Sequence, residues 1–524
     1  MRSEELFEVL NDIDENEIVK AREYRAVKKT SLLRWILPAA CAAAVLIIAA
    51  VSPLISKKLS EDPAADKPTP AGTSDLSVKD GDSSGNTEAA AQITPADTPV
   101  ITGEYSLPEN MSAVMAAYPE PVAAGMEASA FMESDAHWNW WDDYRTKMSS
   151  SFGLQSGMEH YYLTMMDQLL KADDENTVIS PLNTYIAFAM LAELSDGNTR
   201  RQLLDLLGAP DIETLRSDVN TLWNGNYVDT PILKSILANS LWLNDTVNYK
   251  AEALDTLSKD YYASTFYGDP STPEMSEALR NWTDQNTGGF LGDYVKDMEL
   301  DPSTVLSIVS TIYYRAMWYD EFYAAGNTRE SFHGTLGDTM VDMMHRSDMN
   351  EIYRTDAFTA IGLGLNDSGS MYFFLPNEGV DVNSLLSDPD TIKATRTEYN
   401  EDDENATTVM VNLSLPKFSV SKNSDLTQAL KKCGISDAFD PAVSDFSPLT
   451  TDRDELYVSK VEHAALVEID EQGVTGAAYT HIDLSGGTLL PEEEIDLVLD
   501  RPFMFMICGR DGSVLFAGIV RNIT

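Results

Sequence analysis

The chain has 524 residues, with 37 Lys and Arg against 84 Asp and Glu, and its formal net charge is −47. This charge repels phosphate backbones and anionic lipid surfaces, so nucleic acid is excluded as an expected partner. The chain is longer than one ordinary hydrophobic core supports, and we expect one large domain with appended segments. The three cysteines, Cys41, Cys433 and Cys508, are expected to form no disulfide, although so few cysteines do not place the protein inside the cell.

The N-terminal part contains one candidate membrane span, the uncharged run Trp35 to Ile55. Basic residues are more frequent before it than after it: Lys20, Arg22, Arg25, Lys28, Lys29 and Arg34 against Lys57 and Lys58. The positive-inside rule therefore predicts a cytoplasmic segment at 1–34, a transmembrane anchor at 35–55 and an extracellular remainder. A cleaved signal peptide is the alternative, but the preceding segment is long and no small-x-small site follows.

Residues 56–106 are rich in Ala, Pro, Ser, Thr, Gly and Asp and contain almost no aromatic residues. Such a composition predicts a disordered extracytoplasmic linker, with a reach on the order of 40 Å. Residues 107–154 form an N-terminal extension that includes His137, Trp138, Trp140 and Trp141. The sequence leaves open whether this extension packs against the domain or presents a surface of its own.

From Gln155 onward, periodicity predicts helices first and strands later. We expect helices over 155–170, 182–194, 250–262, 274–294 and 425–433, and strands over 232–243, 304–318, within 351–375, and through most of the C-terminal part. Helices followed by antiparallel-type strands predict an α+β domain over 155–524.

The segment Val467 to Phe503 contains two strand-like runs separated by a stretch of small residues. Alternate positions of this stretch are small or apolar: Val474, Gly476, Ala478, Thr480, Ile482 and Leu484. The intervening positions are mostly polar, and they include Tyr479, His481 and Asp483. Alternation with period two predicts a strand with one buried face and one solvent face, whereas the glycines weaken it as a permanent strand. The segment therefore reads as a loop that is able to become a strand.

From about Gln155 to Thr524 the chain resembles the serpin family, because the following motifs occur in the family's order: Asn176 to Pro181, Ala238 to Trp242, Asn281-Trp282 with Thr287-Gly288-Gly289, Ile312 to Trp318, Leu415-Pro416-Lys417-Phe418, Leu456 to Ser459 with His463, and Arg501-Pro502-Phe503. The resemblance implies a large central β-sheet, further sheets, about eight or nine helices and an exposed reactive loop. It also implies a suicide inhibitor rather than an enzyme, in which a serine protease cuts the loop and the loop then inserts into the sheet.

The resemblance assigns a hinge to Glu471, Gly473, Val474, Gly476 and Ala478. Counting from the hinge glycine places the cut bond at Gly487–Thr488, with the window Ser485, Gly486, Leu489 and Leu490. A polar cluster of Ser180, Asn183, Ser310 and His463, with Trp318 under the hinge, is expected to control opening of the sheet. Family members usually carry Ser and Asn at the positions of Asn183 and Ser310, and the effect of this exchange stays open.

No Lys or Arg lies between Val461 and Asp500, so elastase-like or subtilisin-like proteases are expected rather than trypsin-like ones. The histidines lack zinc spacing, and we expect no cofactor or metal. The expected protein is a monomeric, membrane-tethered inhibitor that forms a covalent complex with its protease. A non-inhibitory serpin-like binding module at the cell surface is the alternative.

Overall fold

The computed structural model describes residues 107–108, 110–289, 295–296, 298–396, 403–450, 456–474 and 493–523. The predicted cytoplasmic segment 1–34, transmembrane span 35–55 and linker 56–106 lie outside these ranges. Within the ranges, no helix combines the length and the apolar character that crossing a membrane requires.

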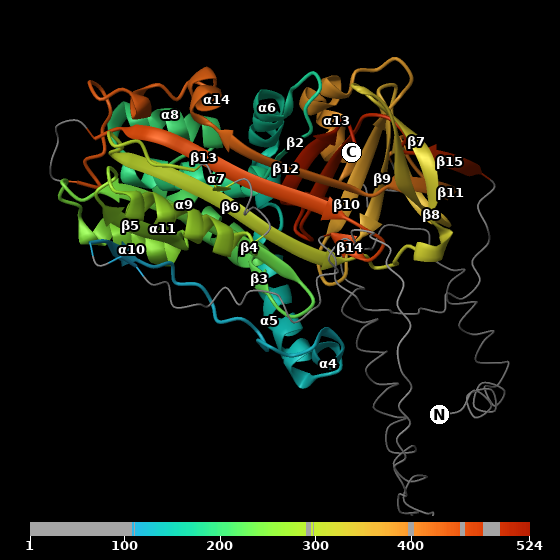
Figure 1. The fold of residues 1–524 in the computed structure, drawn as a ribbon, viewed down its shortest axis with the longest axis horizontal. Coiled ribbons are helices and arrows are strands. Elements are labelled where there is room, and N and C mark those ends of the chain that lie inside the picture. Colours follow the sequence, from blue (N-terminus) through green and yellow to red (C-terminus); the bar gives the residue numbers. More distant parts are fainter. Residues whose placement is uncertain are drawn as a thin grey trace, which may run out of the picture. The chain divides into compact units, whose positions relative to one another are not determined.

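Helices dominate the N-terminal part of the described chain (Figure 1). The α-helices are α4 (Ala128–Met132), α5 (Asp135–Ser151), α6 (Glu159–Leu170), α7 (Pro181–Leu194), α8 (Gly197–Leu207), α9 (Ile212–Asn226), α10 (Ala251–Asp260), α11 (Pro273–Asn286), α13 (Pro389–Ala394) and α14 (Thr427–Lys432). Short 3-10 turns are η2 (Leu154–Gly157), η3 (Ala324–Gly326), η4 (Val382–Ser387) and η5 (Asp437–Phe439). Helix α11 ends earlier than its periodicity predicted, because Gly288 and Gly289 adopt positive φ angles of 66° and 77° that the helix cannot continue through.

The first sheet, sheet A, has the order β1-β5-β4-β6-β14-β13-β12, with β3 added beside β4. Its strands are β1 (Ser112–Val114), β3 (Val228–Asp229), β4 (Lys234–Asn244), β5 (Ala263–Gly268), β6 (Leu306–Met317), β12 (Phe418–Asp425), β13 (Val458–Ile469) and β14 (Gly473–Val474). Figure 1 shows β6 and β13 as long neighbouring arrows, with β14 beside their arrowheads.

The second sheet, sheet B, has the order β15-β11-β8-β9-β10-β16-β17-β2, with β7 paired to β8. Its strands are β2 (Thr177–Ile179), β7 (Thr328–Gly334), β8 (Gly337–Arg354), β9 (Phe358–Gly364), β10 (Ser370–Pro376), β11 (Ala406–Pro416), β15 (Glu494–Val498), β16 (Phe503–Cys508) and β17 (Val514–Val520). The two sheets and the helices confirm the predicted α+β fold class.

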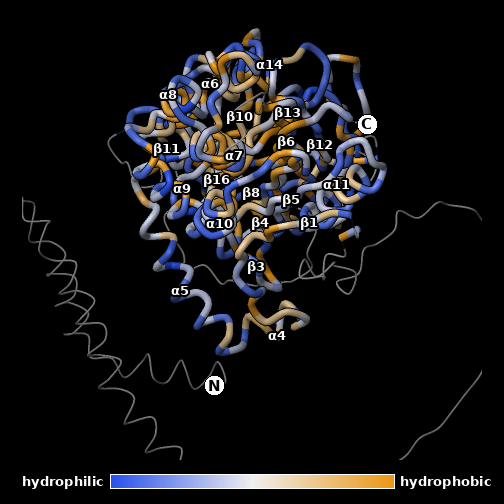
Figure 2. Tube along the Cα trace, turned by 90° about the vertical axis from the view of Figure 1, so that its left-hand side faces the viewer, coloured by the Kyte–Doolittle hydropathy of each residue, from blue (hydrophilic) through white to orange (hydrophobic). Residues whose placement is uncertain are grey.

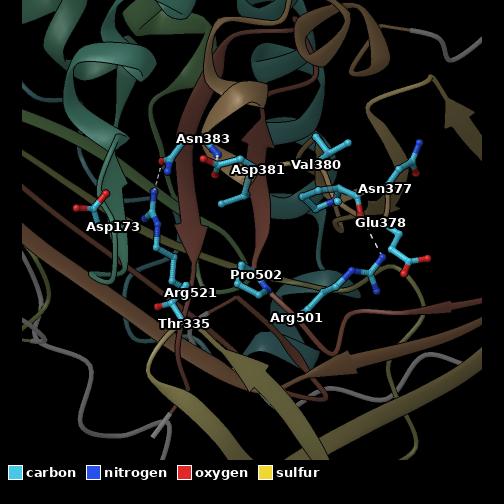
Figure 3. Close-up of a pocket in the computed structure, with 13 residues that line it drawn as sticks. Asp173, Thr335, Asn377, Glu378, Val380, Asp381, Asn383, Arg501, Pro502 and Arg521 are labelled. Carbon is cyan, nitrogen blue, oxygen red and sulfur yellow. Dashed lines mark hydrogen bonds between the residues drawn. The ribbon is translucent and has the colours of Figure 1, made fainter.

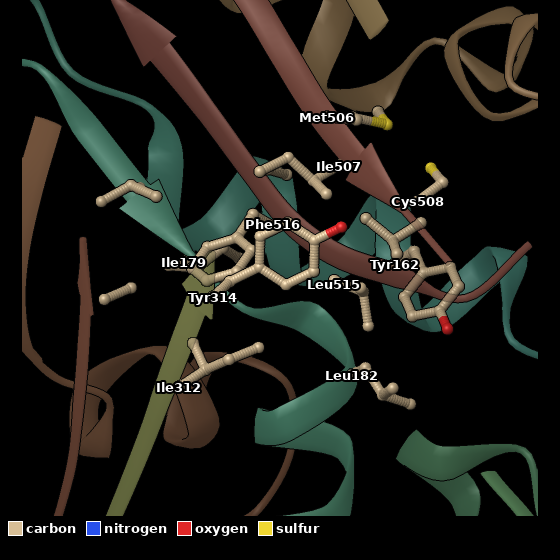
Figure 4. Close-up of a cluster of buried hydrophobic side chains, with 14 of the residues drawn as sticks. Tyr162, Ile179, Leu182, Ile312, Tyr314, Met506, Ile507, Cys508, Leu515 and Phe516 are labelled. Atoms are coloured by element: carbon tan, nitrogen blue, oxygen red, sulfur yellow. The ribbon is translucent and has the colours of Figure 1, made fainter. Parts of the chain in front are cut away.

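Helix α7 forms the centre of the core (Figure 2). Most of its side chains are apolar, and every residue except Glu193 is buried, as expected for a helix enclosed on all sides. The helix begins after Ser180, whose side chain accepts a hydrogen bond from the Asn183 amide, and Pro181 occupies the first turn. Figure 4 shows Ile312 and Tyr314 of β6 entering the same core beside Leu182 and Phe516.

The N-terminal extension is folded against the domain. Strand β1 pairs antiparallel with β5 and lengthens sheet A at its edge. The Tyr118 ring stacks on Trp223 and Tyr227 of the α9 region, with centroid distances of 5.9 and 5.6 Å. Helix α5 packs along α9, and its Trp141 ring lies 4.8 Å from the Arg510 guanidinium carbon. Of the two possibilities for this extension, the structure therefore shows packing on the domain.

Candidate functional site

The turn that follows β13 is held by the Asp470 carboxylate. This carboxylate accepts hydrogen bonds from the backbone amides of Gln472 at 2.8 Å and Gly473 at 3.1 Å. The Asp470 carbonyl accepts a bond from the Trp318 indole Nε1 at 2.9 Å, and the Trp318 amide donates to the Gln472 carbonyl at the same distance. Trp318 is fully buried and thus fixes the turn from below.

After this turn the chain re-enters sheet A as β14, between β13 and β6. Val474 stands opposite Ile469 of β13 and Ala316 of β6, antiparallel to both strands. It is buried, with 1% of its surface exposed. A Cβ on Gly473 would lie 2.2 Å from the Ala316 carbonyl oxygen. Close approach of two backbones therefore requires glycine here, and the hinge role of Gly473 stays a prediction.

Glu471 lies in the same turn and is bound by two side chains. Its carboxylate contacts the Lys417 ammonium at 2.5 Å and accepts a hydrogen bond from the Asn327 amide at 2.5 Å. Burial alone would raise the pKa of Glu471, but these bonds hold that pKa below its usual value. The carboxylate is thus kept charged where it joins the hinge to Lys417, between β11 and β12, and to Asn327, before β7.

The predicted polar cluster comes together beneath the centre of sheet A. The Asn183 amide nitrogen donates to Ser310 Oγ at 2.8 Å and to the Thr311 carbonyl at 2.5 Å, and its oxygen accepts from Asn239 Nδ2 at 2.9 Å. The Ser180 amide donates to His463 Nε2 at 2.8 Å. These bonds link α7 to β4, β6 and β13, which are the strands on both sides of the expected opening.

His463 is held neutral. Burial lowers its pKa to about 4, against the opposing effect of its bond to Ser310. Because the Ser180 amide donates to Nε2, the neutral ring carries its proton on Nδ1, which faces Ser310 Oγ at 3.3 Å. The ring therefore accepts from α7 and donates towards β6.

The exchanged pair Asn183 and Ser310 conserves a hydrogen bond. The amide lies on the helix and the hydroxyl on the strand, and the two atoms are 2.8 Å apart. Of the two effects that the sequence left open, the geometry favours conservation of the bond over loosening of the cluster.

Sheet A is closed along only part of the boundary between β6 and β13. Six residue pairs join the strands in parallel, from Leu306 and Val458 to Thr311 and Ala464. Beyond these pairs, within the described strands, β6 and β13 no longer pair with each other. Each of them pairs with β14 instead. Strand β14 therefore separates β6 from β13 at one end of their boundary, whereas Leu306 to Thr311 pair directly with β13.

A cavity of about 470 Å³ lies elsewhere, around the turn after β10 (Figure 3). Arg521 lines it but is buried and committed to the fold, because its guanidinium donates to the carbonyls of Leu170 and Glu175 and to the Asn383 side chain. Within the described ranges, no group of three or more His, Cys, Asp or Glu side chains is arranged to hold a metal ion.

Several predicted residues lie outside the described ranges: Gly476, Ala478, Ser485, Gly486, Gly487, Thr488, Leu489 and Leu490. Their roles stay predictions. Sequence reasoning also missed Asp470, Asn239 and Lys417 as parts of the site. The available signal for Asp470 was its position two residues before Gln472, because an Asp side chain often accepts a hydrogen bond from the backbone amide two residues later.

A family model described as serpin (serine protease inhibitor) matches residues 157–523. Alpha-1-antitrypsin of Meriones unguiculatus is 28% identical over 71% of this chain and 88% of its own length. Leukocyte elastase inhibitor of Homo sapiens is 28% identical over 66% of this chain and 92% of its own length. An uncharacterized serpin-like protein of Thermococcus kodakarensis is 28% identical over 67% of this chain and 82% of its own length.

Solved structures show the same fold. The native thermophilic serpin tengpin superposes with a TM-score of 0.63 at 24% identity and covers 70% of this chain and 93% of its own. Human thyroxine-binding globulin gives a TM-score of 0.61 at 24% identity and covers 72% and 100%. Because the family model covers residues 157–523, which are most of the chain, this chain belongs to the serpin family.

Proposed function

We propose that this protein is a membrane-tethered suicide inhibitor of serine proteases. Family membership supports the inhibitor class. The uncharged run 35–55 and the excess of basic residues before it support an anchor with residues 1–34 in the cytoplasm and the serpin domain, 155–524, outside the cell. Residues 56–106 then serve as the linker that holds the domain away from the membrane.

The placement of β14 carries the inhibitory part of the proposal. Continuing the antiparallel register from Val474 opposite Ala316 puts residue 478 opposite Ile312 and residue 482 opposite Ile308. Directly opposite residues project to the same face of a sheet, and Ile312 and Ile308 belong to the main core. The small or apolar alternate residues of the loop would therefore enter the core after cleavage. Serpin loop insertion is a known case of this kind of step, in which an extended segment adds a strand to an existing sheet.

The same register accounts for the glycine at position 476. It would stand opposite Tyr314, whose ring packs against Phe516 at a centroid distance of 6.0 Å and whose hydroxyl bonds Ser368 at 2.6 Å. A large aromatic neighbour compensates for a strand glycine by covering its exposed backbone. The glycine is thus compatible with insertion.

The proposed targets are elastase-like or subtilisin-like proteases. No Lys or Arg lies between Val461 and Asp500, so a pocket that requires a cation finds no side chain in the loop. The relative named leukocyte elastase inhibitor is compatible with this preference. The proposed cut is at Gly487–Thr488.

The test is to incubate the full-length chain with elastase, subtilisin and trypsin and to resolve the products on a denaturing gel. We expect a covalent complex with the first two proteases and none with trypsin. A loop that is cut by all apolar-specific proteases without complex formation and without a gain in stability would instead support the non-inhibitory binding module.

The variant Val474→Arg should convert the inhibitor into a substrate. Val474 is already buried in β14 of the intact protein, so an arginine here would cost several kcal/mol and keep this end of the loop out of sheet A. The acyl-enzyme would then hydrolyse before the rest of the loop enters the sheet. Thr475→Glu is the matched control, because the next residue falls opposite Arg315 on the other face of the sheet and should still permit inhibition. Equal inhibition by Val474→Arg and the parent protein would contradict the assigned inward face.

A further inference from the structure

Strands β8, β11 and β15 of sheet B share an exposed outer face. Their pairings place eight side chains on it: Ser347, Met349, Glu351, Thr408, Met410, Asn412, Glu494 and Asp496. Met349 stands opposite Met410, and it is 38% exposed. The alternate residues Val409, Val411 and Leu497 belong to the main core, so the first set points outward. Methionine is enriched at protein–protein interfaces, and two of them lie side by side here.

The carboxylates beside these methionines are held in place by one amide. Asn412 Nδ2 donates to Glu494 Oε1 and to Asp496 Oδ1, both at 2.9 Å. Asn412 Oδ1 in turn accepts a hydrogen bond from Ser347 Oγ at 2.6 Å. None of the eight positions on the face is Lys or Arg. Two methionines therefore lie next to a fixed acidic border, to which Glu351 adds a third negative charge.

The face begins close to the bond that we expect a protease to cut. Glu494, the first residue of β15, follows Thr488 by six positions, and six extended residues span at most about 22 Å. A cut later in the predicted window would shorten this span. A protease domain of about 240 residues has a radius on the order of 20 Å. A protease bound at the cut bond therefore has its own surface within reach of the face.

We propose that this outer face of β8, β11 and β15 is a docking surface for the target protease, and that it fits a protease with a basic surface beside its active site. The proposal rests on the proposed function, because the protease is brought to the face by the loop. Carboxylates attract a basic partner and raise its association rate, while the methionines supply an apolar contact. A second copy of this chain is a poor occupant, since its acids would face those of the same surface.

This surface separates two kinds of charge recognition. The loop offers no Lys or Arg to a specificity pocket, so the pocket of the target is expected to be apolar. The acidic face makes no demand on that pocket and selects instead by the charge around it. Among proteases that accept small or apolar residues, the inhibitor would therefore prefer those with a basic surface.

The test measures the second-order rate constant at which a strongly cationic elastase cuts the loop of the full-length chain or is captured by it. The triple variant Glu351→Gln, Glu494→Gln, Asp496→Asn removes the three charges but keeps oxygens that can accept from Asn412. At 0.01 M ionic strength the Debye length is about 30 Å, and we expect the variant to react on the order of tenfold more slowly than the parent. At 1 M salt the difference should fall below about twofold.

Two further comparisons separate charge from contact. Met349→Ser should slow the reaction by about threefold at both salt concentrations, because an apolar contact is not screened. A subtilisin with a near-neutral surface should react with the parent and the triple variant at rates within about twofold of each other. A tenfold loss with this neutral protease would contradict recognition by charge.

The matched control is the triple variant Glu213→Gln, Glu252→Gln, Glu277→Gln, which removes three exposed charges from α9, α10 and α11. Figure 1 shows these helices at the other end of the domain from β8, β11 and β15. The control should lose less than about twofold with the cationic elastase. Equal slowing by the two triple variants would overturn the docking surface, because net charge alone would then explain it. Cutting without a covalent complex would overturn the proposed function instead, and the rate of cutting would still test the surface.

Discussion

The exchange of Asn183 and Ser310 gives a direct test of how sheet A is held shut. Asn183→Ser removes an amide that donates to Ser310 Oγ and the Thr311 carbonyl and accepts from Asn239. The site is buried, and each hydrogen bond contributes about 1 kcal/mol, with a larger cost for any group left unpaired. We therefore expect the free energy of unfolding to fall by about 3 kcal/mol.

The reciprocal change, Ser310→Asn, should also destabilise the protein, because two amide side chains then compete for the space of one. The double variant Asn183→Ser with Ser310→Asn restores one amide and one hydroxyl with their positions exchanged. We expect its loss of unfolding free energy to be smaller than the sum of the two single losses by about 1–2 kcal/mol.

The measurement is guanidinium chloride denaturation of the intact full-length chain for the parent and the three variants. Ser195→Ala combined with Ser310→Asn is the control. Among the described residues, the Ser195 hydroxyl bonds only the Ala192 carbonyl of its own helix, so the two losses should be additive. If the losses of the Asn183 and Ser310 variants add within about 0.5 kcal/mol, the hydrogen bond between helix and strand does not couple them.

Three further predictions follow from the hinge, the cluster and the extension. The pKa of His463 is about 4 in the folded protein and near 6.5 in the unfolded chain, so the unfolded chain binds the proton first as the pH falls. The free energy of unfolding should therefore fall by about 3 kcal/mol between pH 6.5 and pH 4. The fall should be smaller in His463→Gln. Tyr118→Ala should lower unfolding free energy by about 3 kcal/mol by removing a ring stacked on α9, and an unchanged midpoint would contradict the packing of the extension. Gly473→Ala should displace β14 from Ala316 and speed amide exchange at Val474.

Periodicity predicted the elements whose character is local. The strand expected over 304–318 is β6, the helix expected over 182–194 is α7, and the helix over 425–433 is α14. Non-local features were beyond this reasoning. The pairing of Val474 with Ala316 joins residues 158 positions apart in the chain. The stacking of Tyr118 on Trp223 and Tyr227 joins residues more than a hundred positions apart.

The site shows the same division. The hinge and the polar cluster followed from the resemblance, whereas the contact of Gly473 with its neighbour did not. The structure places this glycine against the Ala316 carbonyl in a formed strand, which gives a second reason for glycine besides the predicted hinge. Helix α11 packs on one face of sheet A, where Leu279 and Trp282 share an apolar cluster with Val309. Alternation could not predict this packing, because it separates two faces of a strand without showing what lies on either.

If the loop inserts as proposed, the position of β14 also indicates which step limits insertion. The residues immediately after Val474 would pass Arg315, Tyr314, Tyr313 and Ile312, where no β6–β13 pairing in the described strands has to break. The first closed pair, Thr311 with Ala464, is met only when residue 479 arrives. Directly beyond it lie Ser310 and His463, tied to α7 by Asn183 and Ser180. In the proposed insertion, each added residue would replace one parallel pairing between β6 and β13 with antiparallel pairings to both strands. The main resistance would therefore fall at the polar cluster and not at the hinge.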